Sequence, residues 1–185
     1  MRTWRGRSAK TLEYRSRDAA QPVIPADAWR QLNSGVTCPT TMRGKCLCGN
    51  IEFALVGATP KFYQCHCSLC RKQGGSSSNT ATIVESRDLR WVSGQDRISS
   101  FIKPTGFRSD FCSECGSPVP NPLRNTPYYW VPAGLLEGED KLEIVAHLYV
   151  GSKASWDSIN SSGTQYETMP QFATFLQLLH AGNVT

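Results

Sequence analysis

The sequence lacks both a membrane span and a secretory signal. It contains no continuous run of about 18 apolar residues, the length that a transmembrane helix requires. Residues 1–25 are rich in arginine and have no continuous apolar core, so they do not resemble a signal peptide. Because small disulfide-stabilised scaffolds are secreted, this absence disfavours disulfides as the use of the eight cysteines.

A basic surface is also missing from most of the chain. The formal net charge is +5 at pH 7, but residues 1–41 contain seven Lys or Arg and only three Asp or Glu. The remaining 144 residues therefore contribute only +1. Recognition of nucleic acid needs a concentrated basic patch, so we expect no nucleic-acid partner for this part of the chain, and no membrane partner.

Residues 1–41 differ from the rest of the chain in composition. Arginines and a lysine are scattered among Ser, Ala and Thr, and Pro22 and Pro25 would break a helix. We therefore predict a basic, flexible N-terminal extension, with one possible helical turn at residues 27–32. Two alternatives are a mitochondrial transit peptide and a true start at Met42. The expected location is cytoplasmic, or mitochondrial if the extension is a transit peptide.

From Gly44 onward the hydrophobic pattern is that of short strands separated by turns. Residues 51–55 alternate between apolar and polar after a turn at Gly49 and Asn50, as in a strand. Further strands are predicted at residues 62–64, 81–84, 89–92, 98–102, 106–111, 128–131 and 142–150. We expect residues 71–78 to form a loop, and residues 170–179 to form a helix with one apolar face. The fold class is therefore mainly β and antiparallel, with a short C-terminal helix.

Seven cysteines fall into three clusters with the spacing of metal ligands. The clusters are Cys46-Leu47-Cys48, Cys65-His66-Cys67-Ser68-Leu69-Cys70 and Cys112-Ser113-Glu114-Cys115. Thiolates spaced this closely suit a soft, tetrahedral metal such as Zn²⁺. Cys-x-Cys neighbours are also too close to form a comfortable disulfide. Cys38 stands apart and is predicted to be unliganded.

The number of cysteines favours two different zinc sites. Seven thiols can fill one closed site of four ligands and leave three ligands for a site with an open position, as in catalytic zinc sites. This count favours a structural site of Cys46, Cys48, Cys112 and Cys115 and a catalytic site of Cys65, Cys67 and Cys70. The alternative partition, in which Cys65 and Cys67 join Cys46 and Cys48, stays open at this point. His66 could also replace one of the thiols, but we expect it to point away, because Cys67 and Cys70 already complete a set of three thiols.

Three motifs of the chain resemble those of the glutathione-dependent formaldehyde-activating family, which includes centromere protein V. These motifs are Gly44-Lys45-Cys46-Leu47-Cys48-Gly49-Asn50-Ile51, the segment from Cys65 to Lys72, and Arg108 to Ser117. Weaker similarities continue at residues 133–136, 147–149, 155–156 and 169–170. The resemblance covers about residues 42–170, which we take as the zinc domain, between the extension 1–41 and a helix and tail at 171–185.

The resemblance implies a β-tent fold of antiparallel sheets with two zinc ions per chain. It places a structural zinc on Cys46, Cys48, Cys112 and Cys115 and a catalytic zinc on Cys65, Cys67 and Cys70. It also implies a carbon–sulfur lyase that acts on S-hydroxymethylglutathione, or forms it from glutathione and formaldehyde. A small-molecule thiol such as glutathione is then the expected partner. The alternatives are a non-catalytic binding or adaptor module and an enzyme with an unrelated substrate.

Other polar residues near the cysteines are candidates for supporting roles. His66 and Glu114 are candidates for proton transfer because they are close to the clusters in sequence. Arg71 and Lys72 could contact a carboxylate of glutathione, or simply form a solvated basic loop.

Overall fold

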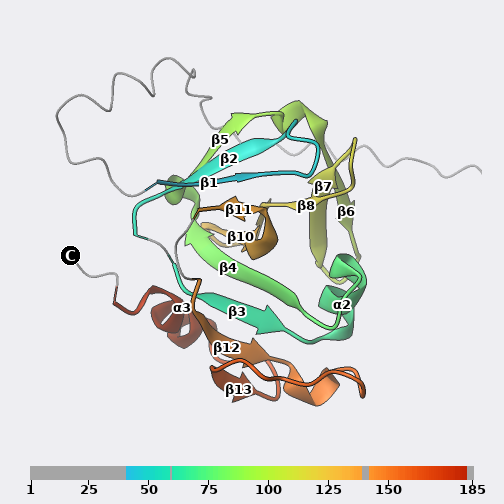
Figure 1. Ribbon diagram of the computed structural model, residues 1–185, viewed down its shortest axis with the longest axis vertical. Helices are drawn as coiled ribbons and strands as arrows, with labels where there is room; N and C mark the ends of the chain where they lie inside the picture. Colours follow the sequence, from blue (N-terminus) through green and yellow to red (C-terminus); the bar gives the residue numbers. More distant parts are fainter. Residues whose placement is uncertain (1–40, 59, 139–141, 183–185) are drawn as a thin grey trace, which may run out of the picture.

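The computed structural model describes residues 41–58, 60–138 and 142–182, which form three β-sheets and two α-helices (Figure 1). The predicted extension, apart from Thr41, and Cys38 therefore lie outside the described residues. In the described part of the chain no helix is long and apolar enough to cross a membrane.

The first sheet contains the first hairpin of the described residues. It has four strands in the order β11 (Leu136–Glu137), β1 (Thr41–Lys45), β2 (Glu52–Val56) and β5 (Leu89–Ser93). All of its pairings are antiparallel. A side chain at Gly44 would collide with the ring of Phe53 on the neighbouring strand, so this position requires a glycine. The turn that joins β1 to β2 carries Cys46 and Cys48.

The second sheet carries the central cysteines. It has six strands in the order β13 (Thr164–Tyr166), β12 (Ile144–Leu148), β3 (Phe62–Cys65), β4 (Asn79–Glu85), β10 (Tyr128–Pro132) and β9 (Asn121–Pro122). The β3–β4, β4–β10 and β10–β9 pairs are antiparallel, whereas β12 runs parallel to both β3 and β13. The parallel pairing places Leu148 beside Cys65, so that the end of β12 lies next to the central cysteine cluster.

The third sheet stands beside the other two and ends at the last cysteine pair. It consists of β6 (Ile98–Ile102), β7 (Arg108–Cys112) and β8 (Pro118–Val119), all antiparallel. Figure 1 shows β6 and β7 above the helix α2 (Ser68–Gly74), which follows β3. Short 3-10 helices occupy four connections, at η1 (Ser86–Asp88), η2 (Gln95–Arg97), η3 (Ala133–Leu135) and η4 (Val150–Ser152).

The hydrophobic interior has two parts, and each part borders one of the cysteine clusters. One part contains Ile51, Phe53 and Trp91, together with Cys46 and Cys112. The other contains Tyr63 and Cys65 and is covered by the helix α3 (Phe172–His180). Phe175 of α3 packs edge-on against Tyr63 with ring centroids 5.0 Å apart, and Leu179 is fully buried. The predicted apolar face of this helix is therefore its docking face.

The mainly β fold with a short C-terminal helix is confirmed, with two differences of detail. The parallel pairings of β12 add to the antiparallel pattern that the sequence predicts. The loop predicted at residues 71–78 is wrong for its first half, because α2 continues to Gly74.

Cys67 caps this helix by accepting a hydrogen bond from the Cys70 amide, and Gly75 ends it in the left-handed conformation. No residue of α2 is buried, so it has no apolar periodicity to detect.

Candidate metal centre

Four cysteines from segments far apart in the sequence meet in one cluster. The sulfur atoms of Cys46, Cys48, Cys112 and Cys115 all lie within 4.8 Å of one another. The Cys46–Cys48 sulfur distance is 3.5 Å and the Cys48–Cys112 distance is 3.8 Å. A Zn²⁺ ion bound to four sulfurs at about 2.3 Å requires edges of roughly 3.8 Å. The cluster therefore has the composition and size of a closed tetrahedral zinc site.

Two glycine turns of similar conformation present these four thiols. Gly49 and Gly116 both have positive φ angles, of 76° and 73°, and their amides donate to the carbonyls of Cys46 and Cys112. Ser117 joins the two turns, because its Oγ accepts a hydrogen bond from the Leu47 amide at 3.0 Å. The hydrogen bond between Ser117 Oγ and Cys115 Sγ, with the Ser117 amide, lowers the pKa of Cys115 to about 5. This favours the thiolate form that a metal requires.

The remaining three cysteines form a second, separate cluster. The sulfurs of Cys65, Cys67 and Cys70 lie within 4.8 Å of one another, at the end of β3 and the start of α2. Cys65 is buried, whereas Cys67 and Cys70 are partly exposed. Among the described residues no fourth Cys, His, Asp or Glu joins this group. The structure thus separates the seven thiols into groups of four and three, and it does not bring Cys65 and Cys67 to Cys46 and Cys48.

The three thiols shift one another's pKa values through hydrogen bonds. Hydrogen bonds from the thiols of Cys65 and Cys70 hold the pKa of Cys67 well below its usual range. The hydrogen bond with Cys67 raises the pKa of Cys65, and the hydrogen bonds with Cys65 and then with Cys67 raise the pKa of Cys70. Since metal ligands must be thiolates, loading this cluster with a divalent metal releases the remaining protons. The set of three thiols is chemically suited to Zn²⁺ and, with no fourth ligand among the described residues, to an open coordination position.

His66 is directed away from the sulfurs into a buried chain of hydrogen bonds. Its Nδ1 donates to Asp157 Oδ2 at 2.7 Å, and its Nε2 lies 3.2 Å from His147 Nδ1. His147 Nε2 in turn lies 3.2 Å from Ser161 Oγ. Both histidines are almost completely buried. These hydrogen bonds anchor the segment from Cys65 to Cys70 to β12 and to the loop that follows β12, over sequence separations of 81 and 91 residues.

Tyr149 and Arg71 also lie beside the three-cysteine cluster. Tyr149 adopts a left-handed conformation with φ of 58°, which is unusual for an aromatic residue. Burial raises the pKa of its hydroxyl, and the charges of Cys65, Cys67 and Cys70 add to this effect. Arg71 donates from Nη2 to the carbonyl of Ser152 at 3.4 Å, while its buried Nε has no hydrogen-bond partner in the described residues.

The other predicted supporting residues are placed differently. Glu114 lies between Cys112 and Cys115 in the sequence and forms a 3.5 Å ion pair with Arg97, and it is not a member of the three-cysteine group. Lys72 lines a pocket on the face of α2 that meets β6 and β7.

The residues themselves do not predict a functional role for Asp157, His147 and Tyr149. Their chemistry was visible in the sequence, but their position beside the cysteines depends on the parallel β12–β3 pairing.

These features define a mainly β protein with two cysteine clusters that could hold metal ions. The sequence profile of the family described as glutathione-dependent formaldehyde-activating enzyme matches residues 41–152. The chain belongs to this family.

Two proteins are similar to parts of this chain. A protein of Halomonas elongata described as a putative glutathione-dependent formaldehyde-activating enzyme is 31% identical over 83 residues, which cover 41% of this chain. The match spans 52% of that relative, so the chain covers about half the length of the curated protein it matches. A crystal structure of a Rhodobacter sphaeroides protein is 30% identical and covers 54% of this chain and 91% of its own, with a TM-score of 0.45.

Proposed function

We propose that the protein is a zinc-dependent carbon–sulfur lyase acting on a thiol–aldehyde adduct such as S-hydroxymethylglutathione. In the reverse direction it would form that adduct from glutathione and formaldehyde. The observation that supports this proposal is the set of three partly exposed thiols with no fourth ligand among the described residues. The name of the family supports glutathione and formaldehyde as the reactants.

Each cysteine cluster has a distinct role in this proposal. Cys46, Cys48, Cys112 and Cys115 would hold a structural zinc, and Cys65, Cys67 and Cys70 would hold a catalytic one. Zinc at the second cluster would supply Lewis-acid stabilisation of a substrate sulfur as a thiolate.

The overall reaction is balanced without a redox partner. In synthesis, the thiol sulfur forms a bond to the carbonyl carbon, and the thiol proton ends on the former carbonyl oxygen. In cleavage, the carbon–sulfur bond breaks, the hydroxyl proton leaves the oxygen, and the sulfur departs as a thiol. A group that donates a hydrogen bond to this oxygen would assist both directions.

We assign that hydrogen bond to Tyr149, which packs against the same apolar cluster as Cys67 and Cys70. A tyrosine hydroxyl is protonated at neutral pH and can donate, and burial raises the pKa of Tyr149 further above its usual range. The hydrogen bond from Arg71 to Ser152 ties η4, which follows Tyr149, to the helix that carries Cys70. A strained left-handed residue next to reactive groups is a common feature of functional sites. His66 is engaged with Asp157 and His147, so we assign it an anchoring role.

Cobalt substitution tests the open position directly. In protein loaded with Co²⁺, added glutathione should change the thiolate-to-cobalt charge-transfer bands, because a new sulfur ligand enters. S-methylglutathione, which has no free thiol, is the matched control and should leave the bands unchanged. Cys70→Ser should abolish the response to glutathione. If glutathione, other small thiols and their aldehyde adducts all leave the bands unchanged, the protein is better described as a non-catalytic zinc-stabilised binding module.

A further inference from the structure

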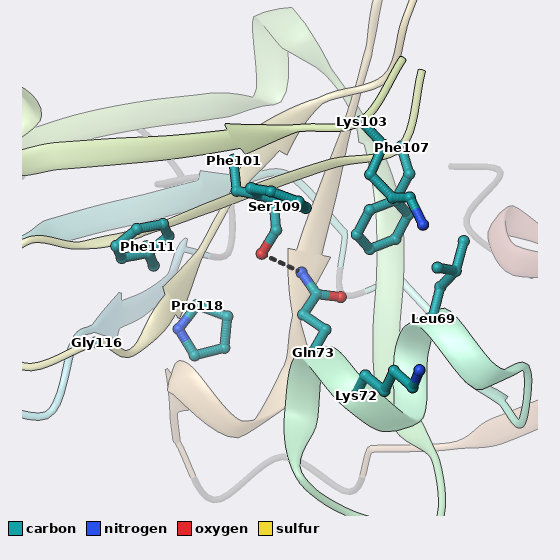
Figure 2. Close-up of a pocket in the computed structure, with 10 residues that line it drawn as sticks. All are labelled: Leu69, Lys72, Gln73, Phe101, Lys103, Phe107, Ser109, Phe111, Gly116 and Pro118. Atoms are coloured by element: carbon teal, nitrogen blue, oxygen red, sulfur yellow. Dashed lines mark hydrogen bonds between the residues drawn. The ribbon is translucent and has the colours of Figure 1, made fainter. Parts of the chain in front are cut away.

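A pocket of about 400 Å³ lies between α2 and the β6–β7 hairpin (Figure 2). This volume is within the range of small-molecule sites, which is about 300–1,000 Å³. Leu69 on α2 lines the pocket and directly precedes Cys70, and Gly116 in the opposite wall directly follows Cys115. The pocket therefore borders the segments that carry both cysteine clusters, but neither cluster lines it.

Most of the pocket wall is apolar and aromatic. Three phenylalanines line it, two of them on β6 and β7 and one in the turn between these strands, and Leu69 and Pro118 complete the apolar surface. Phe101 is 57% exposed, so a large part of its ring faces solvent at the rim. A ligand with an aryl or branched alkyl group would cover this surface and remove it from water.

The polar part of the wall is cationic. Lys72 and Lys103 line the pocket, and in Figure 2 their amino groups lie on the same side of the view, beside Leu69. Neither lysine forms an ion pair with residues 41–58, 60–138 or 142–182. Among the described lining residues none is acidic. The pocket therefore attracts a negative charge and offers no partner for a positive one.

A fixed hydrogen bond lies in this pocket and leaves a donor available. Gln73 Nε2 donates to Ser109 Oγ at 2.8 Å (Figure 2). Asn79 Nδ2 donates to Gln73 Oε1 at 3.0 Å. These two bonds hold the amide of Gln73 between α2 and β7. Because Ser109 Oγ acts as an acceptor here, its own O–H is free to donate to a ligand oxygen.

We propose that this pocket binds a small organic anion, a carboxylate attached to an aryl or branched alkyl group. The carboxylate lies near Lys72 and Lys103, and the apolar group lies against Phe101, Phe107 and Phe111. Glutathione itself is a poor match, because it carries an ammonium group and little apolar surface, whereas the wall has no acidic residue and three phenyl rings. Residues 1–40 are a poor match as well, since they carry a net positive charge.

This proposal goes beyond the lyase function and does not depend on it. The lyase proposal concerns the three sulfurs and is tested by cobalt spectroscopy, whereas the pocket is tested by binding alone. Folded Cys67→Ser protein should bind the anion as the unmodified chain does, even though it would lose the proposed catalytic metal. Failure of one proposal can therefore be distinguished from failure of the other.

The test is a set of three probes measured by calorimetry on the full, zinc-loaded chain. 3-Phenylpropionate carries both the charge and the ring, 3-phenylpropionamide lacks the charge, and propionate lacks the ring. We expect 3-phenylpropionate to bind about tenfold more tightly than propionate, because the ring buries apolar surface. It should bind about fivefold more tightly than the amide, because of the two lysines.

Matched variants connect this binding to the pocket. Phe107→Ala should weaken both aryl probes about tenfold, whereas Trp156→Ala, which removes an exposed aromatic outside the pocket, should have no effect. Lys103→Met should weaken 3-phenylpropionate but not its amide, and Lys45→Met, at an ion-paired lysine outside the pocket, should change neither. The proposal is overturned if no probe binds at about 10 mM. It is also overturned if the three probes bind equally, or if the pocket variants behave like their controls.

Discussion

The two cysteine clusters differ in how they connect the fold. The four-cysteine cluster joins the β1–β2 turn to the end of β7, over a sequence separation of 64 residues between Cys48 and Cys112. The three-cysteine cluster comes from six consecutive residues at the β3–α2 junction. One cluster therefore links two sheets, whereas the other is local in sequence and partly exposed.

This difference indicates why one cluster can be structural and the other reactive. Loss of a long-range link releases two sheets from each other, so its contribution to folding is large. Loss of a local cluster leaves the surrounding strand and helix joined by the peptide chain and their own hydrogen bonds. The hydrogen-bond chain from Asp157 to His147 then holds the local cluster in place without occupying a ligand position.

The largest expected effect is that of removing a thiol from the four-cysteine cluster. Cys112 is fully buried, and its replacement by serine would disrupt the link between the sheets. Binding of a structural zinc contributes about 10–16 kcal/mol, which is comparable to the whole stability of a domain. We expect Cys112→Ser to give insoluble protein or protein without a cooperative thermal transition, as measured by circular dichroism.

The matched change in the other cluster should leave the fold intact. Elemental analysis of the unmodified protein should approach two zinc ions per chain, and Cys67→Ser should retain about one. Because Cys67 is partly exposed and its cluster is local, the Tm should fall by only a few degrees, about 2–4 °C. The proposed lyase activity should be lost. Equal zinc loss and equal Tm for Cys67→Ser and Cys112→Ser would contradict the distinction between the clusters.

Removing the hydroxyl of Tyr149 should affect the reaction without affecting either cluster. Tyr149→Phe keeps the ring but removes the proposed donor, so the turnover rate should fall about 100-fold. Tm and zinc content should be unchanged. Tyr166→Phe, at a tyrosine on β13, is the control variant. An unchanged rate for Tyr149→Phe would exclude the role proposed for this hydroxyl.

The anchor of the three-cysteine cluster should make a smaller contribution, mainly to stability. Asp157→Ala leaves the Nδ1–H of buried His66 without its acceptor, which should cost about 2 kcal/mol of unfolding free energy. Zinc at the three-cysteine cluster should be lost to a chelator more readily than zinc at the four-cysteine cluster. Asp157→Asn retains an acceptor oxygen and should restore most of the zinc retention. A uniform loss of both zinc ions would show that Asp157 supports the whole domain rather than one cluster.

The smallest effect is expected from deletion of residues 1–40. We propose that this segment is an extension of the zinc domain, on the basis of its charge and its lack of hydrophobic periodicity. The shortened chain should keep its zinc content and its Tm within about 2 °C. Loss of cooperative unfolding after this deletion would show that the segment packs on the domain.

Features encoded by neighbouring residues could be predicted from the sequence. The strand pattern follows from alternating apolar residues, and the docking face of α3 follows from Phe175 and Leu179, one turn apart. The two glycine turns that present the four thiols are also local. One is closed by the hydrogen bond between Cys46 and Gly49, and the other by the hydrogen bond between Cys112 and Gly116. The thiol chemistry of the site was also contained in the sequence, because closely spaced cysteines have few other uses.

Which of these features meet depends on the packing of segments that are distant in the sequence. The approach of Cys48 to Cys112 depends on how two sheets pack, and the approach of Asp157 to His66 depends on a parallel pairing of β12 with β3. The sequence does not predict helix α2, because the helix has a cap at Cys67 but no buried residues that would give an apolar periodicity. The left-handed conformation of Tyr149 and the cationic pocket beside α2 also arise from long-range contacts. Sequence spacing determines local geometry, whereas the partners of each segment are set by the packing of the whole chain.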